Sequence, residues 1–358
     1  MPANQRPVLA LTGSLASSKP GEGRDLIEQH LTTDWDIKTW DHADGEPALE
    51  ALLAHADVVV PGVDTLFVGA FFKGLKASPA LRMLQIPFAG TDWLSAELLP
   101  PQAIAAGCSG HEITMAEYTL GAMLEWEIRL RIMDPDFRSG SWQFSGSSKD
   151  PGSFHGELWN KTVGIIGYGG IGEETARRAK AFSMRTMGLK RSAATCPPEL
   201  DWLGATADDP NALNTLLTQS DYVVLACDLN ESTRGMIGAD ELATMKGSAV
   251  IINVARGEVI QEEPFYHALK SKQIAGAVID TWYRYPARGL APGETPADPS
   301  PSAFPFTQLG NVIVTPHCSA HSRNADYRRM ISIAANLDKL ARGETPDRVM
   351  VRGTGFAA

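Results

Sequence analysis

A glycine-rich turn near the middle of the chain, Gly167-Tyr168-Gly169-Gly170-Ile171-Gly172, follows an apolar stretch and opens a segment with helical spacing. In such a turn the first glycine permits a tight bend, the second lets the backbone approach a pyrophosphate, and the third allows a helix to pack closely on a strand. The first N–H groups of the helix then supply donors to the phosphates. The pattern therefore predicts a dinucleotide site. The residues expected at that site are Gly167, Gly169, Gly170, Ile171 and Gly172.

The choice of dinucleotide depends on the end of the next apolar stretch, which reads Leu189-Lys190-Arg191-Ser192. NAD-binding proteins carry an acidic residue there, about 20 residues beyond the turn, that accepts a hydrogen bond from the ribose 2′-hydroxyl. This sequence has no acid at that place, and Lys190, Arg191 and Ser192 suit a 2′-phosphate. We therefore expect NADP rather than NAD. The alternative is that both cations are merely solvated, or that Arg191 stacks on the adenine, and that NAD is used.

Three downstream segments take the interpretation further. They read Asn253-Val254-Ala255-Arg256-Gly257, Gly276-Ala277-Val278-Ile279-Asp280-Thr281 and Thr315-Pro316-His317. In this order and spacing they resemble the D-isomer specific 2-hydroxyacid dehydrogenase family, which includes glyoxylate/hydroxypyruvate reductases, phosphoglycerate dehydrogenases and formate dehydrogenases. The resemblance implies an NAD(P)-dependent oxidoreductase that interconverts a 2-oxo acid and a D-2-hydroxy acid by hydride transfer.

The resemblance also implies roles for single residues. Arg256 matches the family's arginine that binds the substrate carboxylate, and a bidentate guanidinium suits a planar carboxylate better than lysine does. His317 matches the general acid/base, and imidazole titrates near neutral pH. The alternatives are a surface arginine and a structural histidine. The backbone of Ala89, Gly90 and Thr91, in a stretch similar to the family's substrate loop, would complete the carboxylate site.

Further cofactor contacts are implied at the ends of the later strands. Asp280 matches the family's acid that contacts the nicotinamide carboxamide. Cys227 stands where relatives use backbone against the cofactor ribose, and a small buried thiol is commonly structural rather than nucleophilic. The remaining residues that the resemblance places at the cofactor are Thr233, Val254 and Ala255.

The sequence departs from the family pattern at Tyr285, where members usually carry a glutamate that pairs with the catalytic histidine. A phenol can share a hydrogen bond with His317 but supplies no charge, so the pKa of the imidazole is expected to fall. Three explanations stay open: another carboxylate such as Glu294 serves, the enzyme works with a histidine of lower pKa, or the site has lost the reaction. We count Tyr285 with Arg256 and His317 as the predicted catalytic residues.

A second histidine, His321, follows His317 four residues later. At the start of a helix two such residues share a face, so we expect His321 to shape the substrate pocket or to pair with Tyr285. No metal site is expected, because the sequence lacks a His-Glu-x-x-His pattern and nucleotide-linked hydride transfer needs no metal.

Two rival functions remain for this fold. One is a dehydrogenase of a non-hydroxyacid substrate of the formate or phosphite type. The other is a catalytically impaired, nucleotide-sensing protein, as in the corepressors that share the fold. Arg256 and His317 argue against the sensor, whereas Tyr285 argues for it.

Two series of alternating strands and helices must position these residues, which predicts an α/β protein of two Rossmann-like parallel-sheet domains with a cleft between them. We expect a substrate domain from residues 1–118 and 321–358, and a dinucleotide domain over 119–320. Helices are expected over 111–130 and 319–342. The strands expected in the second domain are 163–166, 186–189, 222–225, 249–252, 277–279 and 312–314.

A polar, Gly/Ser-rich stretch over residues 134–156 contains aromatic residues, among them Trp142, Phe144 and Phe154. It is interpreted either as a surface loop or as an arm that packs on a second subunit, because loops of this length usually have a function. The family resemblance implies a homodimer.

The composition limits the classes of partner and the compartment that are expected. The chain has 358 residues and a net charge of −10, which argues against general affinity for nucleic acid or for anionic membranes. Its four cysteines are scattered without a Cys-x-x-Cys pair, which favours a reducing compartment. No secretion signal or membrane span is evident, so a cytoplasmic enzyme with a small-molecule substrate is expected.

Overall fold

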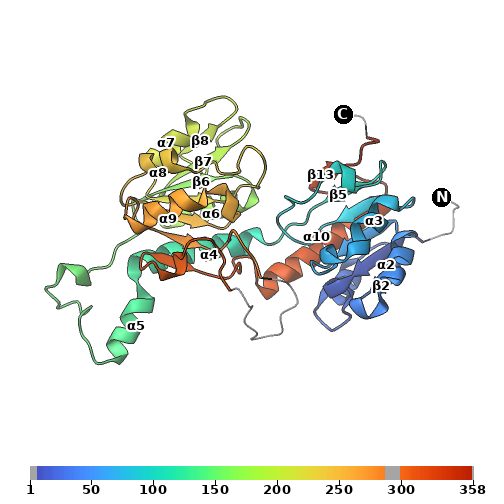
Figure 1. Cartoon of the computed structure of the whole chain (residues 1–358), viewed down its shortest axis with the longest axis horizontal. Coiled ribbons are helices and arrows are strands. Elements are labelled where there is room, and N and C mark those ends of the chain that lie inside the picture. The colour runs from blue at the N-terminus through green and yellow to red at the C-terminus, as the bar shows by residue number, and fades with distance from the viewer. Residues whose placement is uncertain (1–5, 287–298, 357–358) are drawn as a thin grey trace. The chain divides into compact units, whose positions relative to one another are not determined.

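The computed structural model describes residues 6–286 and 299–356 (Figure 1). The chain divides into two compact units: unit 1 comprises Met1–His111 and Ser322–Ala358, and unit 2 comprises Glu112–His321. Each unit has its own sheet, so the predicted fold class of two α/β domains with parallel sheets is confirmed. The predicted boundary after residue 118 falls inside helix α4 (Glu112–Ile128), whereas the units divide just before that helix.

Unit 1 contains a six-stranded sheet with the order β13-β5-β4-β3-β1-β2. All of its neighbouring strands are parallel except β13, which runs antiparallel to β5. The strands are β1 (Val8–Thr12), β2 (Asp36–Trp40), β3 (Val58–Pro61), β4 (Met83–Gln85), β5 (Ile104–Ala106) and β13 (Val349–Arg352). The helices are α1 (Gly23–His30), α2 (Glu46–Leu53), α3 (Gly69–Ala77) and α10 (Arg323–Ala341).

Alternate residues of β1 face opposite sides of this sheet. Leu9 and Leu11 pack in a core with residues of α1 and α10, whereas Ala10 packs in a second core with residues of α2 and α3. A parallel sheet covered on both faces needs nearly continuous apolar strands. That requirement explains the run Val58-Val59-Val60 in β3, all three residues of which are fully buried.

Unit 2 contains a seven-stranded, wholly parallel sheet with the order β12-β11-β10-β9-β6-β7-β8. The strands are β6 (Thr162–Ile166), β7 (Arg185–Lys190), β8 (Trp202–Ala205), β9 (Tyr222–Leu225), β10 (Val250–Asn253), β11 (Gly276–Ile279) and β12 (Val312–Val314). The six predicted strands are all present. The edge strand β8 was not predicted, because its sequence, Trp202-Leu203-Gly204-Ala205, is short and includes a glycine, which weakens a strand.

Helices cover both faces of this second sheet. On one face α4 (Glu112–Ile128) and α6 (Gly170–Ala181) bury Met123 and Ala176 against the sheet. On the other face lie α7 (Ala212–Gln219), α8 (Ala239–Thr244) and α9 (Glu262–Lys270), which bury residues such as Leu216 and Phe265. The dinucleotide turn therefore sits where β6 leads directly into a helix that is anchored on the sheet.

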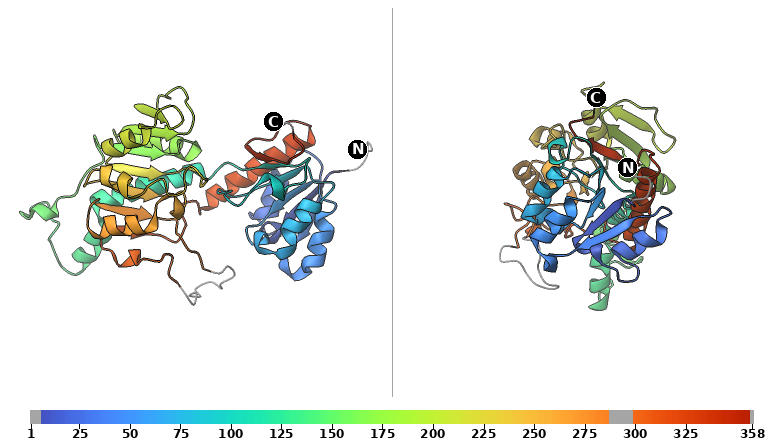
Figure 2. Two further views of the ribbon diagram at one scale, coloured as in Figure 1. Left: turned by 45° about the horizontal axis from the view of Figure 1, so that its top comes forward. Right: turned by 90° about the vertical axis from the view of Figure 1, so that its right-hand side faces the viewer.

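Two predicted local structures differ in their bounds from those observed. The stretch 134–156 is not all loop, because helix α5 spans Leu130–Arg138. It is separated from α4 by Arg129, whose φ of 64° is left-handed, and together with the following chain it extends away from the sheet of unit 2 (Figure 2). The last helix begins at Arg323 rather than at residue 319, because Ser322 caps it by accepting a hydrogen bond from the Ala325 N–H.

None of the helices in residues 6–286 and 299–356 is long and apolar enough to cross a bilayer.

Candidate functional site

The predicted residues of unit 2 lie in one row along the carboxyl edge of its sheet. Because every strand is parallel, the segments that follow the strands meet at the same edge. In spatial order these residues are His317 after β12, Asp280 after β11, Arg256 after β10, Cys227 after β9, Gly167 after β6 and Lys190 at the end of β7. The chain turns from β6 to β7 on one side and continues from β9 to β12 on the other, so the glycine-rich turn sits at the switch in strand order where open α/β sheets bind ligands.

The glycine-rich turn combines crowded positions, such as Gly167 and Gly172, with one open position, Gly169. Gly167 has a φ of 95°, and a Cβ atom there would lie 2.4 Å from the Cys227 backbone nitrogen. A Cβ atom on Gly172 would lie 2.9 Å from the Gly167 carbonyl oxygen. By contrast, a Cβ atom on Gly169 would meet nothing within 4 Å. The open space lies at the N-cap of α6, where no side chain caps the helix, so a pyrophosphate fits the turn.

The end of β7 presents the predicted cations to solvent. Lys190 is half-buried, whereas Arg191 and Ser192 are exposed. In the part of the chain that the structure describes, no ion pair involves Lys190 or Arg191. Their charges are therefore not neutralised by a described carboxylate, as a site for an anionic group requires.

Arg256 lies in a turn that is fixed by its neighbours. The Asn253 side chain donates from Nδ2 to the Arg256 carbonyl oxygen (2.9 Å) and accepts from the Ala255 N–H (3.0 Å). The Arg256 guanidinium donates to the Ala255 carbonyl (2.8 Å) and is half-buried. A Cβ atom on Gly257 would lie 2.6 Å from the Trp282 carbonyl oxygen. Glycine follows the arginine because the backbone at Gly257 passes too close to the backbone at Trp282 to leave room for a side chain.

Asp280 holds the turn that carries His317. It is fully buried, and its Oδ1 accepts hydrogen bonds from the Thr315 hydroxyl (2.6 Å) and the Cys318 N–H (2.8 Å). Its Oδ2 accepts from the Ser319 N–H (3.0 Å). His317 itself is exposed and adopts a left-handed φ of 58°. The contact of Asp280 with a nicotinamide carboxamide stays a prediction.

Tyr285 lies beside His317, as expected from its place in the family pattern. The two ring centroids are 5.4 Å apart and the ring planes are tilted by 48°. The Tyr285 hydroxyl accepts a hydrogen bond from the Trp282 N–H (3.0 Å). The aromatic ring therefore contacts the imidazole where family members present a charged carboxylate. Glu294, the alternative carboxylate, lies outside the described residues.

The helical argument for His321 is wrong. Residues 317–321 form no helix, and the His321 N–H donates to the Cys318 carbonyl (2.9 Å) in a turn that precedes α10. His321 is exposed. Because His317 has a left-handed backbone, the two imidazoles do not share a helical face. A role for His321 at the substrate stays a prediction without that support.

The other predicted cofactor residues also lie on strand ends. Burial raises the pKa of the Cys227 thiol to about 11, so it is a poor nucleophile at neutral pH. Thr233 donates to the Asp228 carbonyl (2.6 Å) in the turn after β9. Val254 and Ala255 are buried directly after β10. Their contacts with a cofactor stay predictions.

The predicted substrate residues Ala89, Gly90 and Thr91 belong to unit 1. They follow β4 (Met83–Gln85), and Gly90 has a φ of 90°, which favours glycine. Their position after a parallel strand resembles that of the residues in unit 2. Their role in binding a carboxylate stays a prediction.

Sequence reasoning missed three hydroxyl groups beside Asp280. The Ser319 hydroxyl is buried and has no hydrogen-bond partner, and such an orphan next to a carboxylate suits a polar ligand group such as an amide. The Tyr118 hydroxyl bonds to Thr315. Tyr118 is spaced with Met115 and Ala122 at the apolar period of its helix, a pattern that favours a core position. A tyrosine among such positions was the available signal, because a buried phenol usually finds a partner.

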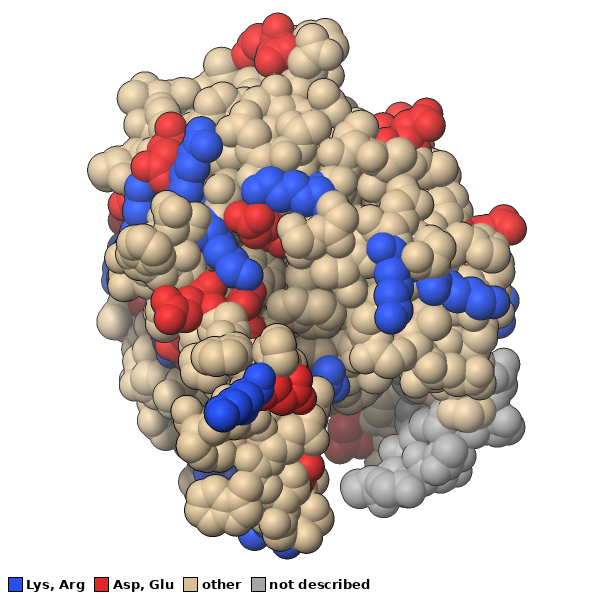
Figure 3. All heavy atoms as spheres, turned by 90° about the vertical axis from the view of Figure 1, so that its left-hand side faces the viewer, with Lys and Arg blue, Asp and Glu red and all other residues tan. Residues whose placement is uncertain are grey.

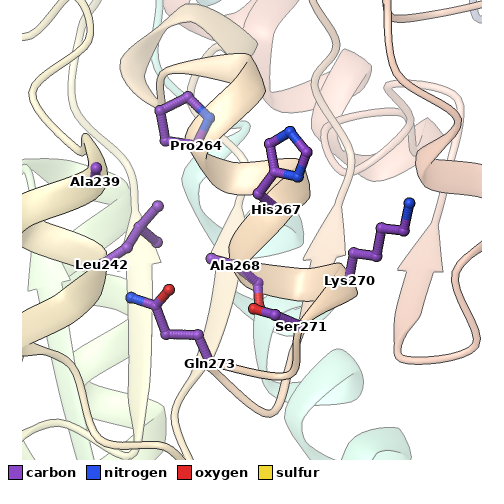
Figure 4. A pocket seen from close by; sticks show the side chains of 8 residues that line it. All are labelled: Ala239, Leu242, Pro264, His267, Ala268, Lys270, Ser271 and Gln273. Carbon is purple, nitrogen blue, oxygen red and sulfur yellow. The ribbon is translucent and has the colours of Figure 1, made fainter.

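A surface pocket of about 510 Å³ lies away from these residues, between α8 and α9 (Figure 4). Its lining residues are Ala239, Leu242, Pro264, His267, Ala268, Lys270, Ser271 and Gln273. None of the predicted catalytic or binding residues lines it. The described residues contain no group of three or more side chains suited to hold a metal ion.

Charges on the face shown in Figure 3 are mixed in sign. Lys and Arg side chains lie next to Asp and Glu side chains there. The described part of this face therefore presents no extended field of one sign, such as steers a polyanion toward a protein.

Comparison with known proteins gives consistent matches. Residues 120–319 match the family model described as D-isomer specific 2-hydroxyacid dehydrogenase, NAD binding domain. A glyoxylate reductase of Thermococcus gammatolerans is 31% identical over 349 residues, which cover 94% of this chain and 96% of the relative. A glyoxylate reductase of Thermococcus kodakarensis is 29% identical over 360 residues, covering 98% and 100%. A solved structure of a D-isomer specific 2-hydroxyacid dehydrogenase family protein from Aeromonas salmonicida has a TM-score of 0.73 at 24% identity, covering 96% of this chain and 98% of that one, and is similar in fold.

Proposed function

Since the chain belongs to the D-isomer specific 2-hydroxyacid dehydrogenase family, whose members are oxidoreductases with an NAD-binding domain, we propose that it reduces a small 2-oxo acid to the D-2-hydroxy acid with NADPH. The family membership covers the reaction class and a nicotinamide cofactor. The specific substrate, the preference for NADPH and the residue roles are the proposal.

The observation that carries this proposal is the order of residues along the sheet edge of unit 2. The cations of β7 and the open space at Gly169 lie on the β6–β7 side, where the adenosine and the pyrophosphate would bind. Asp280 and the buried, unpartnered Ser319 hydroxyl lie on the β11–β12 side, where they suit the nicotinamide amide. When bound, the reduced cofactor supplies the hydride to the carbonyl carbon.

We assign substrate binding and proton transfer to Arg256 and His317, respectively. We assign the half-buried Arg256 guanidinium to the substrate carboxylate and to polarisation of the adjacent carbonyl. His317 would give its proton to the carbonyl oxygen, which becomes the hydroxyl of the product. Tyr285 would limit the mobility of the imidazole through the ring contact at 5.4 Å. Tyr285 thereby contributes to orientation without supplying a charge.

Lys190 and Arg191 support the preference for NADPH, because a 2′-phosphate needs cations that no carboxylate neutralises. We expect Lys190→Ala and Arg191→Ala to weaken NADPH binding about tenfold each and to leave NADH binding within about twofold, which corresponds to roughly 1.4 kcal/mol per lost charge contact. Arg185→Ala is the matched control, since Arg185 is an exposed cation at the opposite end of the same strand. Equal losses for both cofactors would instead indicate that the cations do not select the phosphate.

A homodimer is part of the proposal. Large apolar side chains on α5 and the following arm are exposed in the single chain, among them Phe137 (59%), Trp142 (71%) and Phe154 (75%). Exposed apolar surface of this kind marks an interaction site, and a second copy of the chain is the occupant that the family resemblance implies. We expect the wild-type protein to sediment as a dimer in analytical ultracentrifugation and Phe137→Asp and Trp142→Asp to sediment as monomers.

The function is tested by cofactor-linked turnover. Purified protein is mixed with NADPH or NADH and with glyoxylate, hydroxypyruvate, pyruvate or a bulkier 2-oxo acid, and the loss of reduced-nicotinamide absorbance is followed across pH. Glyoxylate is the first choice because the compared relatives are named glyoxylate reductases. Cofactor binding without reduction of any 2-oxo acid would contradict the proposal. Formate, phosphite and a sensing role would then be tested.

A further inference from the structure

His317 stands on a backbone that its own sequence does not favour. Its φ of 58° lies in the left-handed region, which residues with a Cβ atom rarely occupy. Such a conformation persists only where surrounding contacts hold it, and it is typical of functional sites. The direction of the His317 side chain therefore depends on the bonds that fix the turn from Thr315 to Ser319.

Those bonds converge on Asp280 from both sides of His317. The Thr315 hydroxyl, two residues before it, donates to Oδ1 at 2.6 Å. The N–H groups of Cys318 and Ser319, directly after it, donate to Oδ1 and Oδ2 at 2.8 and 3.0 Å. The Thr315 carbonyl also accepts from the Trp282 indole N–H at 2.9 Å. The carboxylate is fully buried, so these contacts are shielded from water.

One more residue, Tyr118 on α4, is hydrogen-bonded to this set of contacts around Asp280. Its hydroxyl lies 2.6 Å from the Thr315 Oγ1. An ionised carboxylate only accepts hydrogen bonds, so the single Thr315 proton points to Asp280. Tyr118 must then donate to Thr315, which gives a directed chain from Tyr118 through Thr315 to Asp280. Charge-assisted chains of this kind are stronger than isolated bonds between neutral groups.

We propose that Tyr118 is a positioning residue for His317, acting through Thr315 and Asp280. The proposal rests on the proposed acid/base role of His317. In this role Tyr118 acts through its hydrogen bond to Thr315 and not on the reacting atoms. It sets the rotamer of Thr315, which in turn fixes the Asp280 carboxylate that holds the turn on both sides of the histidine.

The chemistry of Tyr118 suits this task. Burial is the largest effect on its phenol and raises the pKa to about 12, so the hydroxyl remains a donor throughout the working range of pH. The position at which family members carry a glutamate is Tyr285, which contacts the imidazole with its ring. Beside this ring contact, the hydrogen bonds to Asp280 fix the backbone on both sides of His317.

The test compares Tyr118→Phe with a matched Tyr266→Phe control in the full-length protein. Tyr266 is a buried tyrosine of unit 2 that belongs to α9 and packs in the core on the other face of the sheet from the half-buried Tyr118. We expect Tyr118→Phe to lower kcat about tenfold while KM for the 2-oxo acid changes less than about twofold. Thr315→Val is expected to lower kcat at least as much, and Thr315→Ser, which keeps the hydroxyl, to restore most of it. Tyr266→Phe is expected to match the wild type.

Amide hydrogen exchange provides a readout that does not depend on turnover. The Cys318 and Ser319 amides are expected to exchange faster in Tyr118→Phe and Thr315→Val than in the wild type or in Tyr266→Phe. An active wild type combined with unchanged kcat and unchanged exchange in Tyr118→Phe overturns the positioning role. A wild type that reduces no 2-oxo acid overturns the proposed function instead, and the exchange rates then decide whether Tyr118 holds the turn.

Discussion

Replacing Gly169 with alanine is expected to weaken cofactor binding without destabilising the fold, whereas the same change at Gly167, two residues earlier, is expected to destabilise the fold itself. The difference follows from the space around each residue. A Cβ atom at Gly169 meets nothing within 4 Å, and one at Gly167 lies 2.4 Å from the Cys227 nitrogen. The pair thus separates a position kept open for a ligand from a position required by the backbone.

The magnitudes can be worked from these contacts. At Gly167 the left-handed φ of 95° adds a penalty of roughly 1–2 kcal/mol for any side chain, and overpacking against backbone adds about 1–3 kcal/mol. A total of about 2–5 kcal/mol is a large part of the 5–15 kcal/mol typical of a folded protein. At Gly169, whose φ is −112°, alanine is allowed. It stabilises the fold by about 0.4–1 kcal/mol because it lowers the conformational entropy of the unfolded chain.

Two assays distinguish the two residues. Chemical denaturation of the protein without cofactor is expected to show a lower free energy of unfolding for Gly167→Ala and an unchanged or slightly higher one for Gly169→Ala. Titration with NADPH is expected to show at least about tenfold weaker binding for Gly169→Ala, because the methyl group occupies the place of the pyrophosphate. Wild-type affinity in Gly169→Ala would refute the placement of the phosphates above this glycine.

Three further predictions concern other residues. The Tyr168 hydroxyl is buried without a hydrogen-bond partner, so Tyr168→Phe is expected to be neutral or to raise the free energy of unfolding by up to about 1–3 kcal/mol in urea denaturation; a clear loss would reveal an overlooked bond. With its pKa raised by burial to about 11, Cys227 is about one-thousandth thiolate at pH 8 and should be alkylated far more slowly than the exposed Cys196, as measured by peptide mass spectrometry; equal rates would contradict its burial. Burial alone would raise the pKa of Asp338, but hydrogen bonds from Thr32 and Thr33 lower it overall. The ionised carboxylate therefore stabilises the folded protein above pH ~4, and this contribution is lost as the pH falls further. Acid unfolding should therefore be less steep in Asp338→Asn, and an identical acid transition would show that this carboxylate contributes nothing.

Sequence reasoning reached the parts of the fold that are specified by nearly continuous apolar runs. Strands such as Val58–Pro61 and Tyr222–Leu225 are buried on both faces, and their composition alone indicates a parallel sheet. The edge strands β8 and β13 are only partly buried and were missed, whereas the edge strand β12, which consists of three β-branched residues, was predicted. In β13 (Val349–Arg352), half-buried and exposed residues alternate. This strand pairs with β5 (Ile104–Ala106), which belongs to the first of the two chain segments that form unit 1.

The candidate site could be predicted only in part for a related reason. The glycine-rich turn and the residues after β10, β11 and β12 are local patterns. The left-handed turn at His317 is not local, because it depends on Asp280, which lies 38 residues before the Cys318 amide that it binds. The same holds for Tyr118, whose partner Thr315 lies 197 residues later in the chain. Contacts over such separations leave no periodic signal in one sequence.

The central claim, that hydride passes from the cofactor to the carbonyl carbon of a 2-oxo acid to give the D-isomer, is tested most directly by isotope transfer. The wild-type protein is incubated with NADPH that carries deuterium at both hydrogen positions of the nicotinamide C4 and with glyoxylate or pyruvate, and the product is examined by mass spectrometry and chiral chromatography. We predict deuterium on the product's second carbon, the D-configuration where that carbon is chiral, and loss of product formation in His317→Asn. An unlabelled product, an L-hydroxy acid or undiminished activity without His317 would contradict the claim.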